Sequence, residues 1–229
     1  MRLLVVNPNT SQGVTDRIDA AATAAAYPGD SIVTVSAASG PRLIVTDADG
    51  RAATVGVLQA IAAHSDPIDG IVLASFGDTG ADAVRAAHPD LPVIGIAQAA
   101  CAETRRLGGL FSVVTFAPEL VPALRRMTHK HGVADALLEI VSVPMALCHD
   151  PADVAEILSD ALRALCMDCA ARGAGSIVLG GGPLAGLAAR IERDCPVPVI
   201  DGTQVAIRQL RARIEAGRSP RSATTEKRT

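Results

Sequence analysis

The chain has 229 residues and a formal net charge of −3, and 49% of its residues are hydrophobic although only three are phenylalanine and one is tyrosine. This length allows one large or two small domains, and without a long basic stretch nothing indicates nucleic acid or an anionic membrane as a partner. No apolar run approaches the roughly 20 residues that cross a bilayer, and the opening segment lacks the small-residue cleavage site of a signal peptide. We therefore expect a cytoplasmic protein that binds a small molecule.

Eight apolar segments of strand length follow one another along the chain, and four of them end in small or polar residues that lead into helical patterns. Since the core must consist of Ala, Val, Leu and Ile, this alternation predicts an α/β fold with buried parallel strands covered by helices. In chain order the segments are "RLLVVNPNTS", "DSIVTVSAA", "GIVLASFGDTG", "LPVIGIA", "FSVVTFAP", "LLEIVSVPMA", "SIVLGGGPLAG" and "VPVID".

The order of these segments repeats. The first four correspond to the last four, which predicts two similar α/β halves of about 100 residues each. We expect the first half to comprise residues 1–96 and the closing helix at 203–217, and the second to comprise residues 97–202. The polar tail at 218–229 is expected to be disordered.

Four loops follow the predicted central strands, at 7–11, 75–80, 115–118 and 180–186. In open parallel sheets, ligands bind outside the carboxyl ends of the strands. Two halves that face each other would therefore place these four loops around one cleft, which is the predicted active site.

The loop "NPNTS" supplies uncharged polar groups. Asn7 and Asn9 suit a carboxylate, an imide or a urea-type edge, and Thr10 or Ser11 is expected to cap the following helix. A tight Asn-Pro turn with a helix cap explains the same residues without a ligand. Both interpretations stay open.

The loop "GGGPLAG" predicts an anion-stabilising site. Gly180, Gly181 and Gly182 leave backbone N–H groups open, and Pro183 is well placed as the first residue of a helix whose positive end would face the cleft. The motif is neither a dinucleotide fingerprint nor a P-loop, because their glycine spacing and the Gly-Lys-Ser/Thr ending are missing. The alternative is a compact turn that simply needs glycine.

Other polar clusters indicate less. His129 and His131 in "THKHG" would diverge on a helix, so no metal site is expected there. Asp150 is most simply a helix N-cap, which leaves His149 as a pocket wall, a surface residue or a base. The CxxC in "LCMDC" lies in a helical pattern and has no second pair, so we expect neither metal binding nor redox use.

Five motifs, "NPNTS", "FGDTG", "PVIGIAQAA", "FSVVT" and "VPVIDG", occur in this order. Together they resemble the hydantoin racemase branch of the aspartate/glutamate racemase superfamily over about residues 2–215. The resemblance implies two flavodoxin-like halves with the active site between them and no cofactor. It also implies one cysteine from each half on opposite faces of the substrate carbon, so that one thiolate removes a proton and the other thiol returns it.

Both of those cysteines are replaced in this chain. The family motifs "ACFGD" and "LGCAGM" correspond to "ASFGD" and "LGGGPLAG", which have Ser75 and Gly181 at the two positions. A free thiol titrates at about pH 8.5 and is readily tuned lower, whereas a serine hydroxyl is a far weaker acid and glycine has no group to offer. None of the five cysteines falls in the four cleft loops, so these positions cannot support two-thiol racemisation.

Our leading interpretation is therefore an isomerase or lyase on this scaffold. It would act on a small hydantoin-type or carboxylated substrate by lyase, desulfhydrase or decarboxylase chemistry, with loop amides stabilising an enolate or oxyanion. Two alternatives stay open: a hydantoin or allantoin racemase that uses groups other than cysteine, and an inactive protein that binds a small molecule.

Three side chains are the candidate catalytic groups: Ser75, Asp78 and His149. Phe76 and Phe116 in the loops suit a planar ring between apolar walls. The full set of candidate substrate-binding residues is Asn7, Asn9, Thr10, Ser11, Phe76, Gly77, Thr115, Phe116, Gly181, Gly182 and Pro183. We expect no metal and no cofactor, a small molecule as the partner, and a homo-oligomer.

Overall fold

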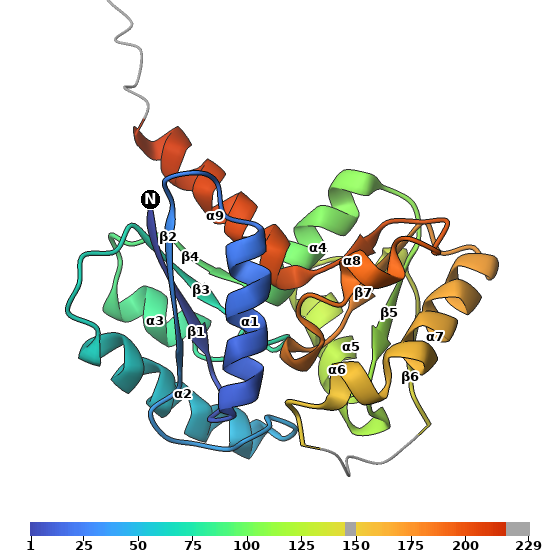
Figure 1. Ribbon diagram of the computed structural model, residues 1–229, viewed down its shortest axis with the longest axis horizontal. Helices are drawn as coiled ribbons and strands as arrows, with labels where there is room; N and C mark the ends of the chain where they lie inside the picture. Colours follow the sequence, from blue (N-terminus) through green and yellow to red (C-terminus); the bar gives the residue numbers. More distant parts are fainter. Residues whose placement is uncertain (145–149, 219–229) are drawn as a thin grey trace, which may run out of the picture.

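Two parallel four-stranded sheets lie side by side in the computed structural model, which describes residues 1–144 and 150–218 (Figure 1). The first sheet has the order β2-β1-β3-β4 and the second has the order β6-β5-β7-β8. This confirms the predicted fold of two pseudo-symmetric α/β halves. The strands are β1 (Arg2–Asn7), β2 (Ser31–Ser36), β3 (Gly70–Leu73), β4 (Val93–Gly95), β5 (Phe111–Thr115), β6 (Leu137–Ser142), β7 (Ser176–Leu179) and β8 (Val199–Ile200).

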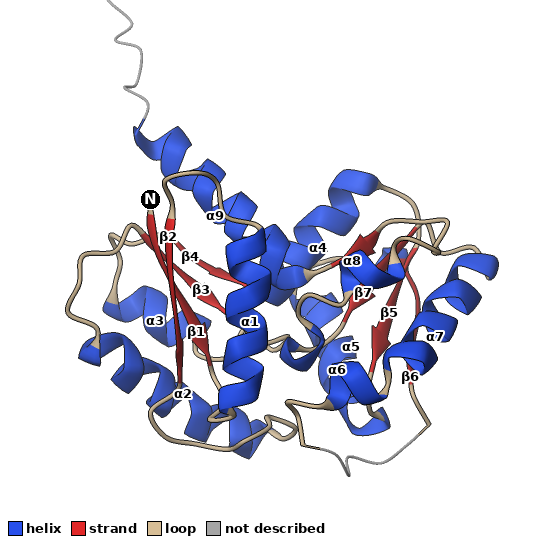
Figure 2. Ribbon diagram, viewed as in Figure 1, coloured by secondary structure: helices blue, strands red, loops and turns tan. Residues whose placement is uncertain are grey.

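Helices flank both sheets (Figure 2). The α-helices are α1 (Gln12–Ala24), α2 (Asp47–Ala63), α3 (Ala81–Ala87), α4 (Ile96–Leu107), α5 (Val121–Lys130), α6 (Val154–Ile157), α7 (Ser159–Ala171), α8 (Ala188–Ile191) and α9 (Gly202–Arg218). Short 3-10 helices are η1 (Pro118–Leu120), η2 (Ala134–Ala136) and η3 (Gly182–Leu184).

The strand register makes the two halves equivalent at the ends of β3 and β7. Leu73 of β3 and Leu179 of β7 are paired with equivalent valines of β1 and β5. The residue after each leucine then donates its N–H to the carbonyl of that valine, at 2.9 Å in the first half and 2.8 Å in the second. Ser75 and Gly181 each lie two residues beyond the leucine, so they occupy equivalent positions.

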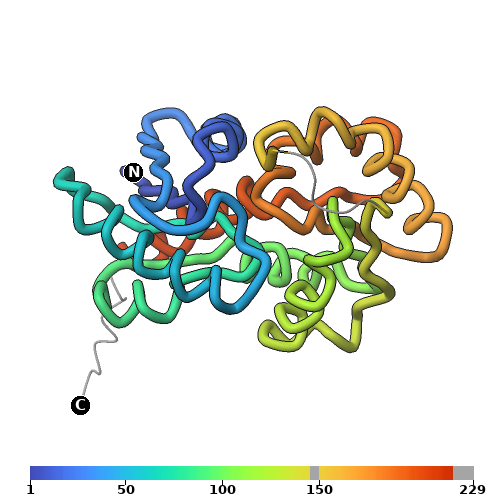
Figure 3. Tube along the Cα trace, turned by 90° about the horizontal axis from the view of Figure 1, so that it is seen from below, coloured from blue at the N-terminus to red at the C-terminus, as the bar shows by residue number. Residues whose placement is uncertain are grey.

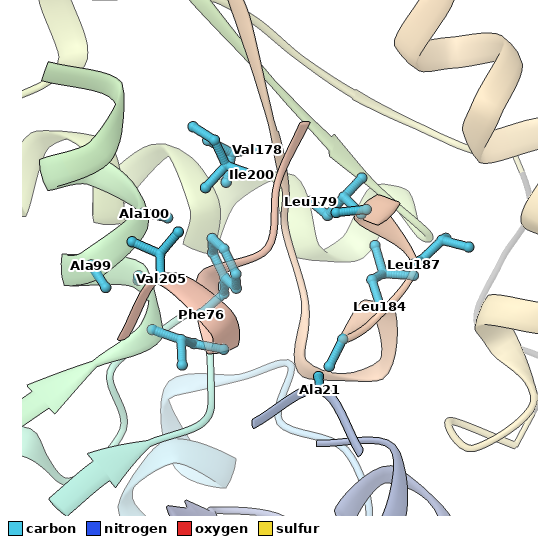
Figure 4. Packing of buried hydrophobic residues seen from close by; sticks show 14 of the residues in the cluster. Ala21, Phe76, Ala99, Ala100, Val178, Leu179, Leu184, Leu187, Ile200 and Val205 are labelled. Carbon is cyan, nitrogen blue, oxygen red and sulfur yellow. The ribbon is translucent and has the colours of Figure 1, made fainter. Parts of the chain in front are cut away.

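One apolar cluster extends through both halves. The central strands β1, β3, β5 and β7 are almost entirely buried, and side chains of all four belong to the cluster. Figure 4 shows Phe76, from the loop after β3, among alanines of α4 and Val205 of α9. Since buried apolar surface contributes about 25 cal/mol per Å², this shared core holds the two halves together.

Helix α9 returns to the first half, where it packs against α1, β3 and β4 and also against α4. Figure 3 shows this return of the chain from the second half, in red. Helix α4 contacts both β4 and β7, so the limits 1–96 with 203–217 and 97–202 stay a prediction. Residues 219–229 of the predicted tail lie outside the described residues. No helix in the described part of the chain is long and apolar enough to cross a membrane.

Replacing either of two glycines of α2 by alanine should change the stability of the protein in opposite directions. A Cβ atom on Gly56 would lie 2.0 Å from the carbonyl oxygen of Ser39, whereas one on Gly50 would meet nothing within 4 Å. We expect Gly56→Ala to lower the free energy of unfolding by at least about 2 kcal/mol because backbone must move. Gly50→Ala should raise it by about 0.5–1 kcal/mol because alanine favours the helix. Urea unfolding followed by circular dichroism measures both, and equal effects would contradict the packing of α2.

Candidate active site

A cavity of about 700 Å³ lies between the two halves at the carboxyl ends of their strands. Its volume is in the range of small-molecule sites, about 300–1,000 Å³. Residues 74–83 and 180–183 form much of its wall, and the rest comes from Asn9, residues 43–46, Phe116, Leu120 and parts of α2 and α5. The predicted site residues in this wall are Asn9, Ser75, Phe76, Gly77, Asp78, Phe116, Gly181, Gly182 and Pro183.

Ser75 is a half-buried residue of this wall, and Thr79 holds its side chain. The Ser75 hydroxyl donates to Thr79 Oγ1 at 3.0 Å, and the backbone N–H of Thr79 donates back to Ser75 Oγ at 3.1 Å. Thr79 also lines the cavity. The loop therefore presents a pair of coupled hydroxyl groups, of which our sequence interpretation included only Ser75.

Asp78 is buried, and its carboxylate is occupied by protein groups. Oδ1 accepts a hydrogen bond from the N–H of Ala97 at 3.0 Å, and Oδ2 accepts one from the N–H of Gln98 at 3.0 Å. Oδ2 also lies 2.8 Å from Nε2 of His131, at the end of α5. Asp78 thus caps the first turn of α4 and links the loop after β3 to α5. Its catalytic role stays a prediction, and these contacts favour a structural role.

The position of Asp78 requires two local features. Its backbone has a φ of +46°, in the left-handed region that non-glycine residues rarely adopt. A Cβ atom on Gly95 would lie 1.9 Å from Asp78 Oδ1. Glycine at position 95 therefore makes room for the Asp78 carboxylate. Because the two positions lie 17 residues apart along the chain, the sequence alone does not reveal this contact.

Asn7 and Thr115 end the equivalent strands β1 and β5, and both hold loops in place. Asn7 is fully buried, and its Nδ2 donates to Asn9 Oδ1 at 2.9 Å and to Thr15 Oγ1 at 3.0 Å. Thr115 donates its hydroxyl to the carbonyl of Gly180 at 2.7 Å. Neither Asn7 nor Thr115 lines the cavity, and neither do Thr10 and Ser11. A role of these residues in substrate binding stays a prediction, and it would be indirect, through the shape of the loops.

The loop after β7 differs from our expectation. Pro183 lies in η3, a single 3-10 turn of three residues, and α8 begins only at Ala188 and has four residues. The helix whose positive end was predicted to face the cleft is thus absent at this place in the described structure. Glycines instead let the loop turn closely beneath Phe116, whose ring lies against Gly181.

Cysteine contributes no acid or base to the described cavity wall. Cys101, Cys166, Cys169 and Cys195 are all buried. Burial raises the pKa of the Cys101 thiol to about 12 and that of Cys166 to about 12 as well. Within residues 1–144 and 150–218, no group of three or more His, Cys, Asp or Glu residues is placed to hold a metal ion.

His149 and Cys148 lie outside the described residues, so the predicted role of His149 stays untested. Asp150, beside them, was expected to be a helix N-cap. It accepts a hydrogen bond from the N–H of Ala152 at 3.0 Å, but the N-cap of α6 is Asp153. The N-cap prediction was wrong because a turn separates Asp150 from the helix.

Two ion pairs join α5 to the first half at the rim of the cavity. Arg126 lies 3.1 Å from Asp47 of α2, and Lys130 lies 3.5 Å from Asp82 of α3. All four side chains are exposed, so each pair contributes about 0–1 kcal/mol. The rim thus carries both signs of charge.

Comparison with known proteins agrees with this architecture. The family model of the Asp/Glu/Hydantoin racemases matches residues 3–210. The chain belongs to this family. It is 31% identical to a hydantoin racemase of Paenarthrobacter aurescens over 95% of this chain and 92% of that protein. It is 32% identical to one of Pseudomonas sp. (strain NS671) over 99% and 91%.

A solved structure supports the same assignment. The allantoin racemase from Klebsiella pneumoniae superposes with a TM-score of 0.86 at 35% identity, over 95% of this chain and 89% of that one. In this member of the Asp/Glu/Hydantoin racemase family, the two equivalent strand ends at the cavity carry Ser75 and Gly181.

Removal of the Asp78 carboxylate should destabilise the fold. Asp78→Ala leaves two backbone N–H groups of α4 and the ring of His131 without their acceptor. We expect a loss of about 2–4 kcal/mol in the free energy of unfolding. Asp16→Ala is the control, because Asp16 accepts one exposed hydrogen bond from Gln12 and should change stability by less than about 0.5 kcal/mol. A loss at Asp78 as small as at Asp16 would show that the anchor is unimportant.

Alkylation should test the burial of the thiols. With pKa values of about 12, Cys101 and Cys166 carry almost no thiolate at pH 8.5. We expect iodoacetamide to leave both unmodified in the folded protein and to modify both in urea, as measured by peptide mass spectrometry. Rapid modification of either residue in the folded protein would contradict its placement in the core.

Proposed function

We propose that this protein binds a hydantoin-type ring and exchanges the proton on the ring carbon beside a carbonyl group, without a catalytic thiol. The main support is similarity at 31–35% identity over at least 95% of the chain to two hydantoin racemases and an allantoin racemase. This favours the proton-transfer chemistry of the racemase alternative over lyase chemistry, which was our leading interpretation of the sequence.

The proposed step uses the hydroxyl pair of Ser75 and Thr79. The C–H bond beside the carbonyl breaks, its electron pair moves to the carbonyl oxygen, and an enolate forms. The proton passes to a water molecule that hydrogen-bonds to Ser75 Oγ, and the hydronium ion that forms releases a proton to bulk solvent. A solvent proton then returns to the carbon and restores the neutral ring.

Backbone N–H groups are available to stabilise the enolate oxygen. Those of Phe76 and Gly77 have no hydrogen-bond acceptor among the described residues, and both residues line the cavity next to Ser75. Donors that are fixed before the reaction stabilise charge that develops in the transition state. We infer that this turn takes the role expected of the loop amides.

A second candidate is a lyase-type reaction such as decarboxylation. The ring of Phe116 against Gly181 favours it, because neither of these two residues offers an acid or a base. A carboxylate substituent would leave as carbon dioxide, its bonding electrons would form the enolate, and one proton from the Ser75 wall would complete the product. This reaction needs a proton donor on one wall only.

Deuterium exchange tests the proposed function. One enantiomer of a 5-substituted hydantoin is incubated with the protein in D₂O, while NMR follows loss of the ring C–H signal and polarimetry follows optical rotation. We expect exchange well above the enzyme-free rate. Ser75→Ala should slow it by about 10²–10⁴-fold, the usual contribution of one positioned acid or base.

The matched control is Ser39→Ala. Ser39 lies outside the cavity wall and its hydroxyl donates to Gln59, so exchange should be unchanged. If the wild-type protein exchanges no proton above background, the proposal is wrong. Decarboxylation of an arylmalonate would then indicate the second candidate, and ligand-induced thermal stabilisation without turnover would indicate a binding protein.

A further inference from the structure

The two walls of the cavity differ at their equivalent positions. Ser75 offers a hydroxyl group, whereas a Cβ atom on Gly181 would lie 2.7 Å from Cε1 and 3.4 Å from Cδ1 of Phe116. Real Cβ atoms essentially never make contacts under 3.0 Å, so a side chain at position 181 would require the ring of Phe116 to shift. The phenyl ring thus occupies the space of a side chain at that position.

The surroundings of Phe116 hold the ring there. It is 3% exposed and belongs to the apolar cluster that extends through both halves. The hydroxyl group of its neighbour Thr115 donates a hydrogen bond to the carbonyl oxygen of Gly180. A Cβ atom on Gly180 would lie 2.8 Å from Cγ1 of Val113. Backbone and ring are therefore packed closely on this wall, and swinging the ring away would open a cavity in the core.

The first half has no equivalent ring. By the strand register, Pro8 occupies the position after Asn7 that Phe116 occupies after Thr115. Position 75 accordingly has room for a side chain, and its hydroxyl group reaches Thr79. The fold repeats in the two halves, but the chemistry at the ends of their strands does not.

We propose that Phe116 is the specificity-determining residue of the site. Its ring closes the Gly181 wall and packs on one face of the bound substrate ring, so that the proton leaves and returns only on the face toward Ser75. This inference rests on the proposed function. It predicts that deuterium enters the substrate with retention of configuration.

Thermal unfolding tests the placement of the ring without any substrate. Gly181→Ala should lower Tm by about 2–12 °C in the wild-type background, because overpacking destabilises a close-packed core of a protein of this size to that extent. In a Phe116→Ala background the same substitution should lower Tm by less than about 2 °C. Additive shifts would overturn the placement of the ring.

The matched control is Gly77→Ala, on the wall that carries Ser75. A Cβ atom there would meet only Thr79 Oγ1, at 3.3 Å. Its effect on Tm should be the same with and without Phe116→Ala. If Phe116→Ala changed the Tm shift of Gly77→Ala as much as that of Gly181→Ala, the specific contact between Phe116 and Gly181 would be contradicted.

The ratio of exchange to inversion tests the consequence for the reaction. With one enantiomer in D₂O, wild-type protein should exchange the ring proton about 100-fold or more faster than it inverts the carbon, because Phe116 and Gly181 offer no acid or base to the other face. Phe116→Ala should lower this ratio by admitting water to that face. Equal rates in the wild type would overturn the proposal. Absence of any exchange would count against the proposed function, and the thermal comparison alone would then decide on Phe116.

Discussion

The register of two pairs of parallel strands determines where the groups of the site lie. Because β3 pairs with β1 as β7 pairs with β5, the chain leaves the sheets at equivalent points and directs Ser75 and Gly181 toward one cavity. The loop after β3 is then fixed by Asp78, which accepts hydrogen bonds from the start of α4 and meets His131 from α5. A shift of either pairing by one residue would turn the side chains of that strand to the other face of the sheet and displace the loop that follows it.

A symmetric scaffold with an asymmetric site follows from this arrangement. The hydroxyl pair of Ser75 and Thr79 is the polar side of the cavity, and the ring of Phe116 over Gly181 is the apolar side. No described residue of either wall is a cysteine, and burial raises the pKa of the Cys101 thiol to about 12. The proton transfer that we propose therefore uses groups that are weaker acids than cysteine, on a fold that is shared with the family.

The sequence alone predicted the elements whose signal is local. Apolar segments followed by small residues identified all eight strands of the described chain and their division into two sheets. The loop "FGDTG" lines the cavity, and its role in catalysis stays a prediction. Pairings between distant residues could not be predicted. His131 lies 53 positions from Asp78, and Phe116 fills space beside a glycine 65 positions away. The predicted helix at Pro183 was wrong because proline and glycine also suit a short 3-10 turn.

A crystal structure with a 5-substituted hydantoin in the cavity tests the account most directly. The proposed reaction predicts that the reactive ring carbon lies within about 3–3.5 Å of Ser75 Oγ or of a water molecule bound to Ser75 Oγ. The opposite face of the substrate ring should then contact Phe116. A substrate bound with its reactive carbon turned away from Ser75, or with Phe116 displaced and water on both faces, would contradict the account.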